Sequence, residues 1–186
     1  MKKYCSITIL FCFYLSGPTI YARHINKTTN ATSKSENKIT NDIIPFDTTT
    51  KTIHIFVALC DNKYQGIVPV PVKIGNGQDP NNNLFWGCGF GICTYFKNSK
   101  EWKLVKSQEV NSIILERLIF KHTTKNYFLI ADAYDGRYIK QCTKDFLNSS
   151  CGQIKNTLAI NNTTIGISGN AQLIAYIGHD GLWIFN

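Results

Sequence analysis

The sequence lacks several patterns that would point directly to a function. It has no dense block of basic residues, although 20 Lys and Arg against 12 Asp and Glu give a formal net charge of +8. Because the positive charge is dispersed among Asn and Thr, it indicates solubility and mild attraction to anionic surfaces, and argues against a nucleic-acid partner. No two cysteines have the CxxC spacing of a zinc site, and no GxGxxG motif follows a predicted strand as a phosphate-binding loop requires.

The apolar run near the N-terminus is too short to span a membrane, which takes about 20 residues. It covers residues 7–15, two lysines precede it, and the break Ser16-Gly17-Pro18 follows it. Ala22 then offers a small residue at a cleavage position. This order predicts a secretory signal peptide over residues 1–22, so we expect a periplasmic or secreted protein with no stable membrane insertion after cleavage.

Composition divides the remaining chain into two parts. Residues 23–51 are polar and rich in Thr, Asn, Ser and Lys, which predicts a disordered leader. Residues 52–186 hold the apolar runs and are expected to form one α/β domain, either whole or incomplete at its C-terminus. This domain carries five cysteines, which we expect to be mostly buried, with room for one disulfide: Cys60, Cys88, Cys93, Cys142 and Cys151.

Apolar runs alternate with amphipathic segments along the domain. Strands buried on both faces are predicted over residues 53–60, 125–134 and 171–177, with a shorter strand over 101–108. Helices are predicted over residues 84–98, 111–122 and 136–150. This alternation predicts an α/β fold with a mostly parallel sheet between helical layers, a three-layer sandwich. The loop over residues 63–83 exceeds the usual limit of about 12–15 residues, which is typical of a functional or disordered loop.

Polar clusters follow the three long strands. They are Asp61 and Asn62, then Asp132 and Asp135, and finally His179 and Asp180. Parallel strands end at one edge of a sheet, and ligands bind at that edge in open α/β folds, so we expect these residues to line one ligand crevice. A simple turn explains Asp61 and Asn62 equally well, and a helix cap explains Asp135 better. His179 is flanked by Gly178 and Gly181, which allow close substrate approach and favour a functional role.

Two resemblances extend this interpretation. Residues 53–180 resemble a family of uncharacterised bacterial proteins that share the motifs VALCDN, GNGQDPNNN, ADAYDG and YIGHDG. More distantly, LIAYIGHDG is similar to the histidine motif of the caspase, gingipain and legumain group of cysteine peptidases. In that group an apolar strand runs into a His-Gly pair, and the next strand ends in the nucleophilic Cys.

The resemblance to the peptidases implies a caspase-like topology with His179 as general base. A thiolate would attack a peptide carbonyl while backbone N–H groups hold the oxyanion. Asp180 departs from the pattern because it separates the histidine from the glycine. Only LWIFN follows the motif, so we expect no counterpart of the strand that carries the nucleophile.

The sequence leaves three functions open and does not decide whether the chain is an enzyme. The first is a caspase-like hydrolase domain that lacks its nucleophile strand and is inactive or incomplete as given. The second is a secreted protein that binds a peptide or small molecule in the same crevice. The third is a metal-dependent hydrolase using Asp61, Asp132, Asp135 and His179. These acids are too scattered to match a known metal motif, so no metal and no cofactor are predicted.

Cys60 complicates the first of these functions. It ends the first long strand, and a neighbouring last strand would bring it toward His179 and restore a nucleophile. A buried small residue is the simpler interpretation, because cysteines outside disulfides are among the most buried residue types.

Overall fold

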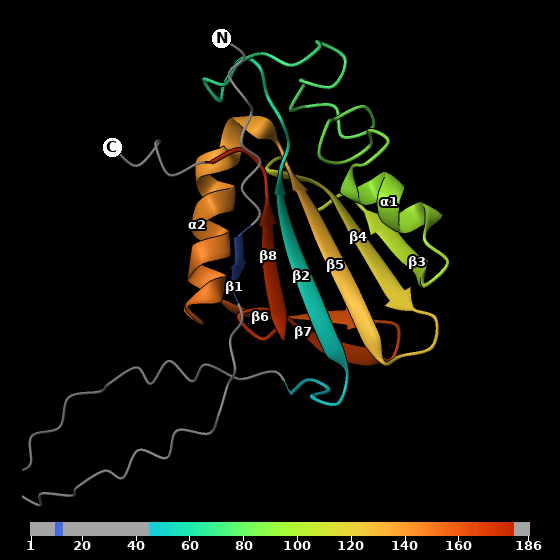
Figure 1. The fold of residues 1–186 in the computed structure, drawn as a ribbon. Coiled ribbons are helices and arrows are strands. Elements are labelled where there is room, and N and C mark those ends of the chain that lie inside the picture. The colour runs from blue at the N-terminus through green and yellow to red at the C-terminus, as the bar shows by residue number, and fades with distance from the viewer. Residues whose placement is uncertain (1–9, 13–44, 181–186) are drawn as a thin grey trace, which may run out of the picture.

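The computed structural model describes residues 10–12 and 45–180 of the chain. These residues form an α/β fold in which one sheet is accompanied by a separate two-stranded hairpin (Figure 1). Most of the predicted signal peptide and leader, including the cleavage position at Ala22, lies outside the described residues, as do residues 181–186. Of the predicted leader, the described end includes Thr50, which is buried, and Lys51, where the first strand of the domain begins.

Eight strands and two α-helices follow one another in the described residues. In chain order they are β1 (Leu10–Cys12), β2 (Lys51–Ala58), α1 (Ile92–Asn98), β3 (Trp102–Gln108), β4 (Ile114–His122), β5 (Tyr127–Tyr134), the 3-10 turn η1 (Gly136–Tyr138), α2 (Ile139–Ser150), β6 (Lys155–Ile160), β7 (Thr163–Ser168) and β8 (Leu173–Ile177). The main sheet has the order β1-β8-β2-β5-β4-β3, and β6 pairs with β7.

The sheet is mixed. β5 and β8 both run parallel to β2, one on each side of it, whereas β4, β3 and β1 join by antiparallel pairing. The prediction of an α/β fold is confirmed. The prediction of a mostly parallel sheet holds only for the three central strands, because the chain between β3 and β5 returns as a strand instead of crossing over as a helix.

A hydrophobic core lies on each face of the sheet, although β3 at its edge is largely exposed. On one face Val57 and Leu118 pack with Trp86 and helix α1. On the other face Phe56 packs with α2 through Phe146, and the β6–β7 hairpin closes over the remainder. Figure 1 shows α2 lying along β8 and β2, with α1 on the opposite side of the sheet near β3 and β4.

The predicted helix over residues 111–122 is wrong, because this segment forms β4. Glu116 and Arg117 separate its two short apolar groups, residues 113–115 and 118–120, and groups of this length suit either an amphipathic helix or a strand. Leu118 and Phe120 face one core cluster while Ile119 faces another. Alternating burial of consecutive apolar residues on both faces is the geometry of a strand.

The predicted helix over residues 84–98 shrinks to α1, which begins at Ile92. Residues 84–91 instead form tight turns, and a Cβ at Gly87 would collide with the backbone oxygen of Asn81. A Cβ at Gly91 would likewise collide with the backbone oxygen of Trp86, so Gly87 and Gly91 serve close backbone contacts, whereas Gly89 faces open space. The β6–β7 hairpin was not predicted, since its residues are polar and alternate only weakly.

The five cysteines of the domain form no disulfide within the described part of the chain. Cys60, Cys93 and Cys142 are buried, and Cys151 is exposed at the end of α2. The expectation of mostly buried cysteines is confirmed.

Candidate functional site

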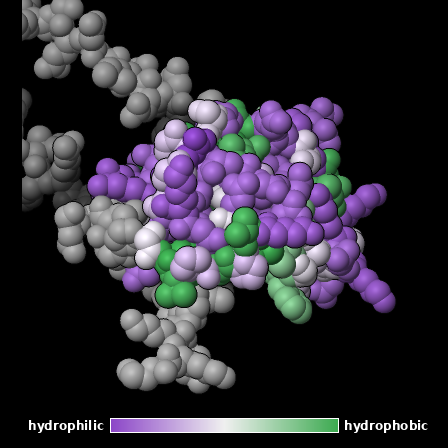
Figure 2. Space-filling model, turned by 90° about the horizontal axis from the view of Figure 1, so that it is seen from above, coloured by the Kyte–Doolittle hydropathy of each residue, from purple (hydrophilic) through white to green (hydrophobic). Residues whose placement is uncertain are grey.

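The three parallel strands end together at one edge of the sheet. β8, β2 and β5 are adjacent and run in the same direction, so Gly178, Cys60 and Asp135 all follow strand ends on that edge. The predicted placement of Asp61 and His179 on a common edge is confirmed. Figure 2 looks down on this edge and shows a mostly hydrophilic surface broken by small hydrophobic patches.

Cys60 and His179 face each other across the ends of β2 and β8. The Cys60 sulfur lies 3.4 Å from His179 Nε2, within hydrogen-bonding distance for a thiol. Cys60 is fully buried and His179 is 6% exposed. The ring of Phe85 packs edge-on against the imidazole, with centroids 5.2 Å apart. The structure therefore brings the two residues together in an apolar setting.

The backbone of Cys60 is clamped by the side chain of Asn83. Asn83 Oδ1 accepts a hydrogen bond from the Cys60 N–H at 3.0 Å, and its Nδ2 donates to the Cys60 carbonyl at 2.8 Å. Asn83 is fully buried and also binds the backbone at Asn76 and Phe85. These contacts fix the position of the thiol relative to the sheet.

The next residue is held in a similar way by Gln65. Gln65 Oε1 accepts a hydrogen bond from the Asp61 N–H at 3.1 Å, while its Nε2 donates to the carbonyls of Leu59 and Gly136. The amides of Cys60 and Asp61 are thus both engaged by side chains. In this conformation neither N–H is available to hold an oxyanion.

His179 is positioned by the chain that precedes it. Its carbonyl accepts a hydrogen bond from the Tyr176 hydroxyl at 2.9 Å. A Cβ at Gly178 would lie 2.7 Å from that hydroxyl oxygen and 3.0 Å from the Ala58 side chain, so a larger residue there would push the Tyr176 hydroxyl away from the His179 carbonyl. Burial lowers the pKa of His179, which keeps the imidazole neutral and able to accept a proton.

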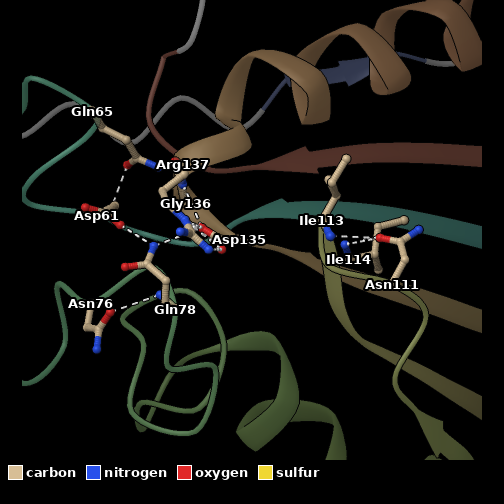
Figure 3. Close-up of polar contacts among 10 residues, drawn as sticks. All are labelled: Asp61, Gln65, Asn76, Gln78, Asn111, Ile113, Ile114, Asp135, Gly136 and Arg137. Carbon is tan, nitrogen blue, oxygen red and sulfur yellow. Dashed lines mark hydrogen bonds and ion pairs between the residues drawn. The ribbon is translucent and has the colours of Figure 1, made fainter.

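The predicted crevice residues Asp61 and Asp135 are part of a closed hydrogen-bonding frame. Asp61 accepts backbone N–H groups from Lys63 and Tyr64, and Asp135 accepts the backbone and guanidinium N–H groups of Arg137. Gln78 Nε2 donates to both carboxylates, at 2.7 and 2.8 Å (Figure 3). Both acids are buried, and both act as turn and cap residues here.

Asn62 has a comparable role in the same loop. Its side chain donates to the Val70 carbonyl and accepts the Val70 N–H, which closes residues 62–70 into a compact loop. Asp180 is exposed beside His179. The long loop over residues 63–83, expected to be functional or disordered, is ordered and supplies the side chains that hold Cys60 in place.

Asp132 lies elsewhere. It sits within β5, on the face covered by α2 and the hairpin, and it accepts two hydrogen bonds from Arg117 and a contact from His54. Burial alone would raise the pKa of Asp132, but the hydrogen bonds from Arg117 and His54 outweigh it and hold the pKa below its usual value. The structure does not bring Asp132 to the Cys60–His179 pair.

Within the described residues, no group of three or more His, Cys, Asp and Glu side chains is arranged to hold a metal ion. A cleft of about 670 Å³ opens beside Gln78, between residues 78–81 and the β3–β4 connection, and Asn111 and Glu116 line its far side. It is polar and reaches the same sheet edge, but Cys60 and His179 do not line it. No helix among the described residues has the length and apolar character that a membrane span requires.

Sequence reasoning missed the residues that position the site, namely Asn83, Gln65, Gln78 and Phe85. The unusual length of the loop that carries most of them was the one signal that marked them. No protein-family model, curated protein or solved structure matches this chain.

Proposed function

We propose that this chain is an exported hydrolase-type domain in which Cys60 is the nucleophile and His179 the general base. The observation that carries the proposal is the 3.4 Å contact between the Cys60 sulfur and His179 Nε2. A base within hydrogen-bonding reach of a thiol is the arrangement that activates cysteine for attack on a carbonyl.

The chemistry follows from the neutral state of the imidazole. Burial disfavours the charged form of His179, so its ring accepts the thiol proton as sulfur bonds to the carbonyl carbon of a substrate. The same proton then passes to the leaving group. Water, deprotonated by His179, releases the acyl group from sulfur and regenerates the thiol.

The described conformation corresponds to a closed, resting state of such a site. Cys60 and His179 are buried, and the two nearest amides are engaged by Asn83 and Gln65. Because the oxyanion has no donor from these amides, we expect little peptidase activity until the loop over residues 62–91 moves.

A caspase-like, three-layer arrangement belongs to the same proposal. Three features support it: the parallel order β8-β2-β5, the histidine at the end of β8, and helices on opposite faces of the sheet. In the peptidase group the nucleophile lies on the strand after the histidine strand. Here the neighbour of β8 on its outer side is the antiparallel β1, so Cys60 of β2 replaces that nucleophile in the proposal.

The test is site-resolved alkylation of the purified exported chain by iodoacetamide across pH, quantified by mass spectrometry. Cys142 is the matched control, because it is as buried as Cys60 and burial raises its pKa well above the usual value. Cys151 gives the rate of an exposed thiol. We expect Cys60 to react faster than Cys142 near neutral pH, and the His179→Ala substitution to abolish that difference.

A binding protein without chemistry is the second candidate, and the engagement of both amides by Asn83 and Gln65 favours it. In that case Cys60 and Cys142 react equally slowly, and His179→Ala changes neither rate. The same experiment therefore separates the two candidates.

A further inference from the structure

The two edges of the main sheet are built differently. β3 forms one edge and carries the exposed lysines Lys103 and Lys106, with a bulge between Leu104 and Lys106. Charged side chains and bulges on an edge strand prevent pairing with other chains. The edge at β3 is therefore protected.

At the opposite edge of the sheet, the strand of the domain is β8, and it has no such protection of its own. Its five residues, LIAYI, include no charge and no proline, and they are buried or half-buried on both faces. An apolar edge strand of this kind pairs readily with another strand. The described residues cover it with the three residues of β1 alone, in antiparallel register with Phe11 opposite Ala175.

The covering strand β1 belongs to the predicted signal peptide. Removal of residues 1–22 on export would take Leu10–Cys12 away and expose the backbone N–H and C=O groups along β8. An antiparallel partner fits this edge, because β1 already pairs there in that orientation.

We propose that β8 is a dimerisation edge and that its occupant in the exported protein is β8 of a second copy. Two-fold symmetry pairs identical strands antiparallel, the orientation in which β1 binds. With Ala175 at the axis, as in the register with Phe11, Ile174 faces Tyr176 and Leu173 faces Ile177 of the second copy. All of these cross-strand pairs are apolar, and the two sheets continue as one. This inference does not depend on the chemistry of Cys60.

Oligomeric mass measured by light scattering over a concentration series tests the proposal. We expect exported chain, with its N-terminus confirmed by sequencing near Arg23, to show twice the mass of the monomer. Full-length chain that retains residues 1–22 is expected to remain monomeric, because β1 occupies the edge. A monomeric exported chain, or a larger open-ended assembly, would overturn the proposal.

Two charge variants make the test specific to the strand register. Leu173→Lys and Ile177→Glu are each expected to be monomeric alone, since a charge then faces an apolar residue in both halves of the interface. Mixing the two variants places the introduced lysine opposite the introduced glutamate in one half of the interface. The other half keeps the native pair of Leu173 and Ile177, so a mixed dimer is expected to form. Failure of the mixture to dimerise, with both variants folded by circular dichroism, contradicts the register.

Hydrogen exchange of the unmodified exported chain covers the case in which a variant does not fold. The amides of Ile174 and Tyr176 are expected to become more protected as concentration rises. Lys106→Glu on the opposite edge serves as the control and is expected to leave the mass unchanged. Protection along β8 that is independent of concentration would also overturn the proposal.

Discussion

Two buried histidines, His54 within β2 and His179 just after β8, differ in what their ring nitrogens contact. His54 Nδ1 accepts the backbone N–H of Ser168 at 3.0 Å, and its Nε2 lies 3.1 Å from Asp132, so both nitrogens have polar partners. His179 instead directs Nε2 at the sulfur of Cys60 and packs its ring against Phe85. Burial is similar at the two positions, so it does not distinguish a structural histidine from a reactive one.

The partners decide the difference. Because Ser168 donates to Nδ1 of His54, the ring proton resides on Nε2 and is donated to Asp132, which is held in turn by Arg117. The tautomer is fixed, and the ring links β2 to the β6–β7 hairpin. His179 contacts a group that can lose a proton, and this makes it the better candidate for chemistry. The following predictions test this contrast, beginning with the largest expected effect.

Substitution of Arg117 by Met should disrupt the His54 cluster most strongly. Arg117 binds Asp132 through two hydrogen bonds of 2.6 and 2.7 Å, and Asp132 is 1% exposed. Removing one partner of a buried ion pair leaves an uncompensated charge and typically costs about 3–5 kcal/mol of unfolding free energy. Urea denaturation measures the loss. The control Arg137→Met removes an exposed guanidinium from Asp135 and should cost much less; equal losses would contradict the assignment.

Substitution of Asn83 by Ala should weaken the clamp around Cys60. It removes the partners of the Cys60 N–H and carbonyl in a buried site, and unsatisfied buried groups cost about 1–3 kcal/mol each. We expect a loss of about 2–4 kcal/mol in urea and faster alkylation of Cys60, because the thiol is no longer held in place. The control Asn111→Ala removes an exposed turn residue that also binds two backbone N–H groups. It should cost about 1 kcal/mol or less and leave Cys60 unchanged.

The sequence predicted the strands that carry the site better than the loop that completes it. The runs ending at Cys60 and at His179 are continuous and apolar, so their burial and parallel pairing could be inferred locally. β4 instead carries Glu116 and Arg117 between its apolar residues, and only its packing between two core clusters identifies it as a strand. Asn83 acts on Cys60 across 23 residues of irregular chain, and no periodic pattern records such a contact.

Acid should destabilise the protein through Asp132. Its pKa is held below the ordinary value in the folded state, so the unfolded chain binds the proton first, near pH 4. This contribution is present above that pH and is lost as the pH falls through the folded pKa. In Arg117→Met, the guanidinium no longer lowers the pKa of Asp132 against the effect of burial, which raises it. The folded pKa is therefore higher, and the acid loss of stability should begin at higher pH. An unchanged acid profile in that variant, measured by urea midpoints, would argue against the pairing.

The smallest expected effect concerns His179 between pH 7 and pH 5. Burial lowers the pKa of this imidazole in the folded protein, whereas in the unfolded chain it titrates near its ordinary value of about 6.5. Below about pH 6.5 the unfolded state therefore binds more protons than the folded state. Unfolding free energy declines as the pH falls, until the pH reaches the lower pKa of the folded protein. His179→Gln should flatten this part of the urea-midpoint profile. Cys60→Ala retains the imidazole and should keep the decline, because burial rather than the thiol causes it. A decline that disappears in Cys60→Ala would instead tie the protonation of His179 to the sulfur.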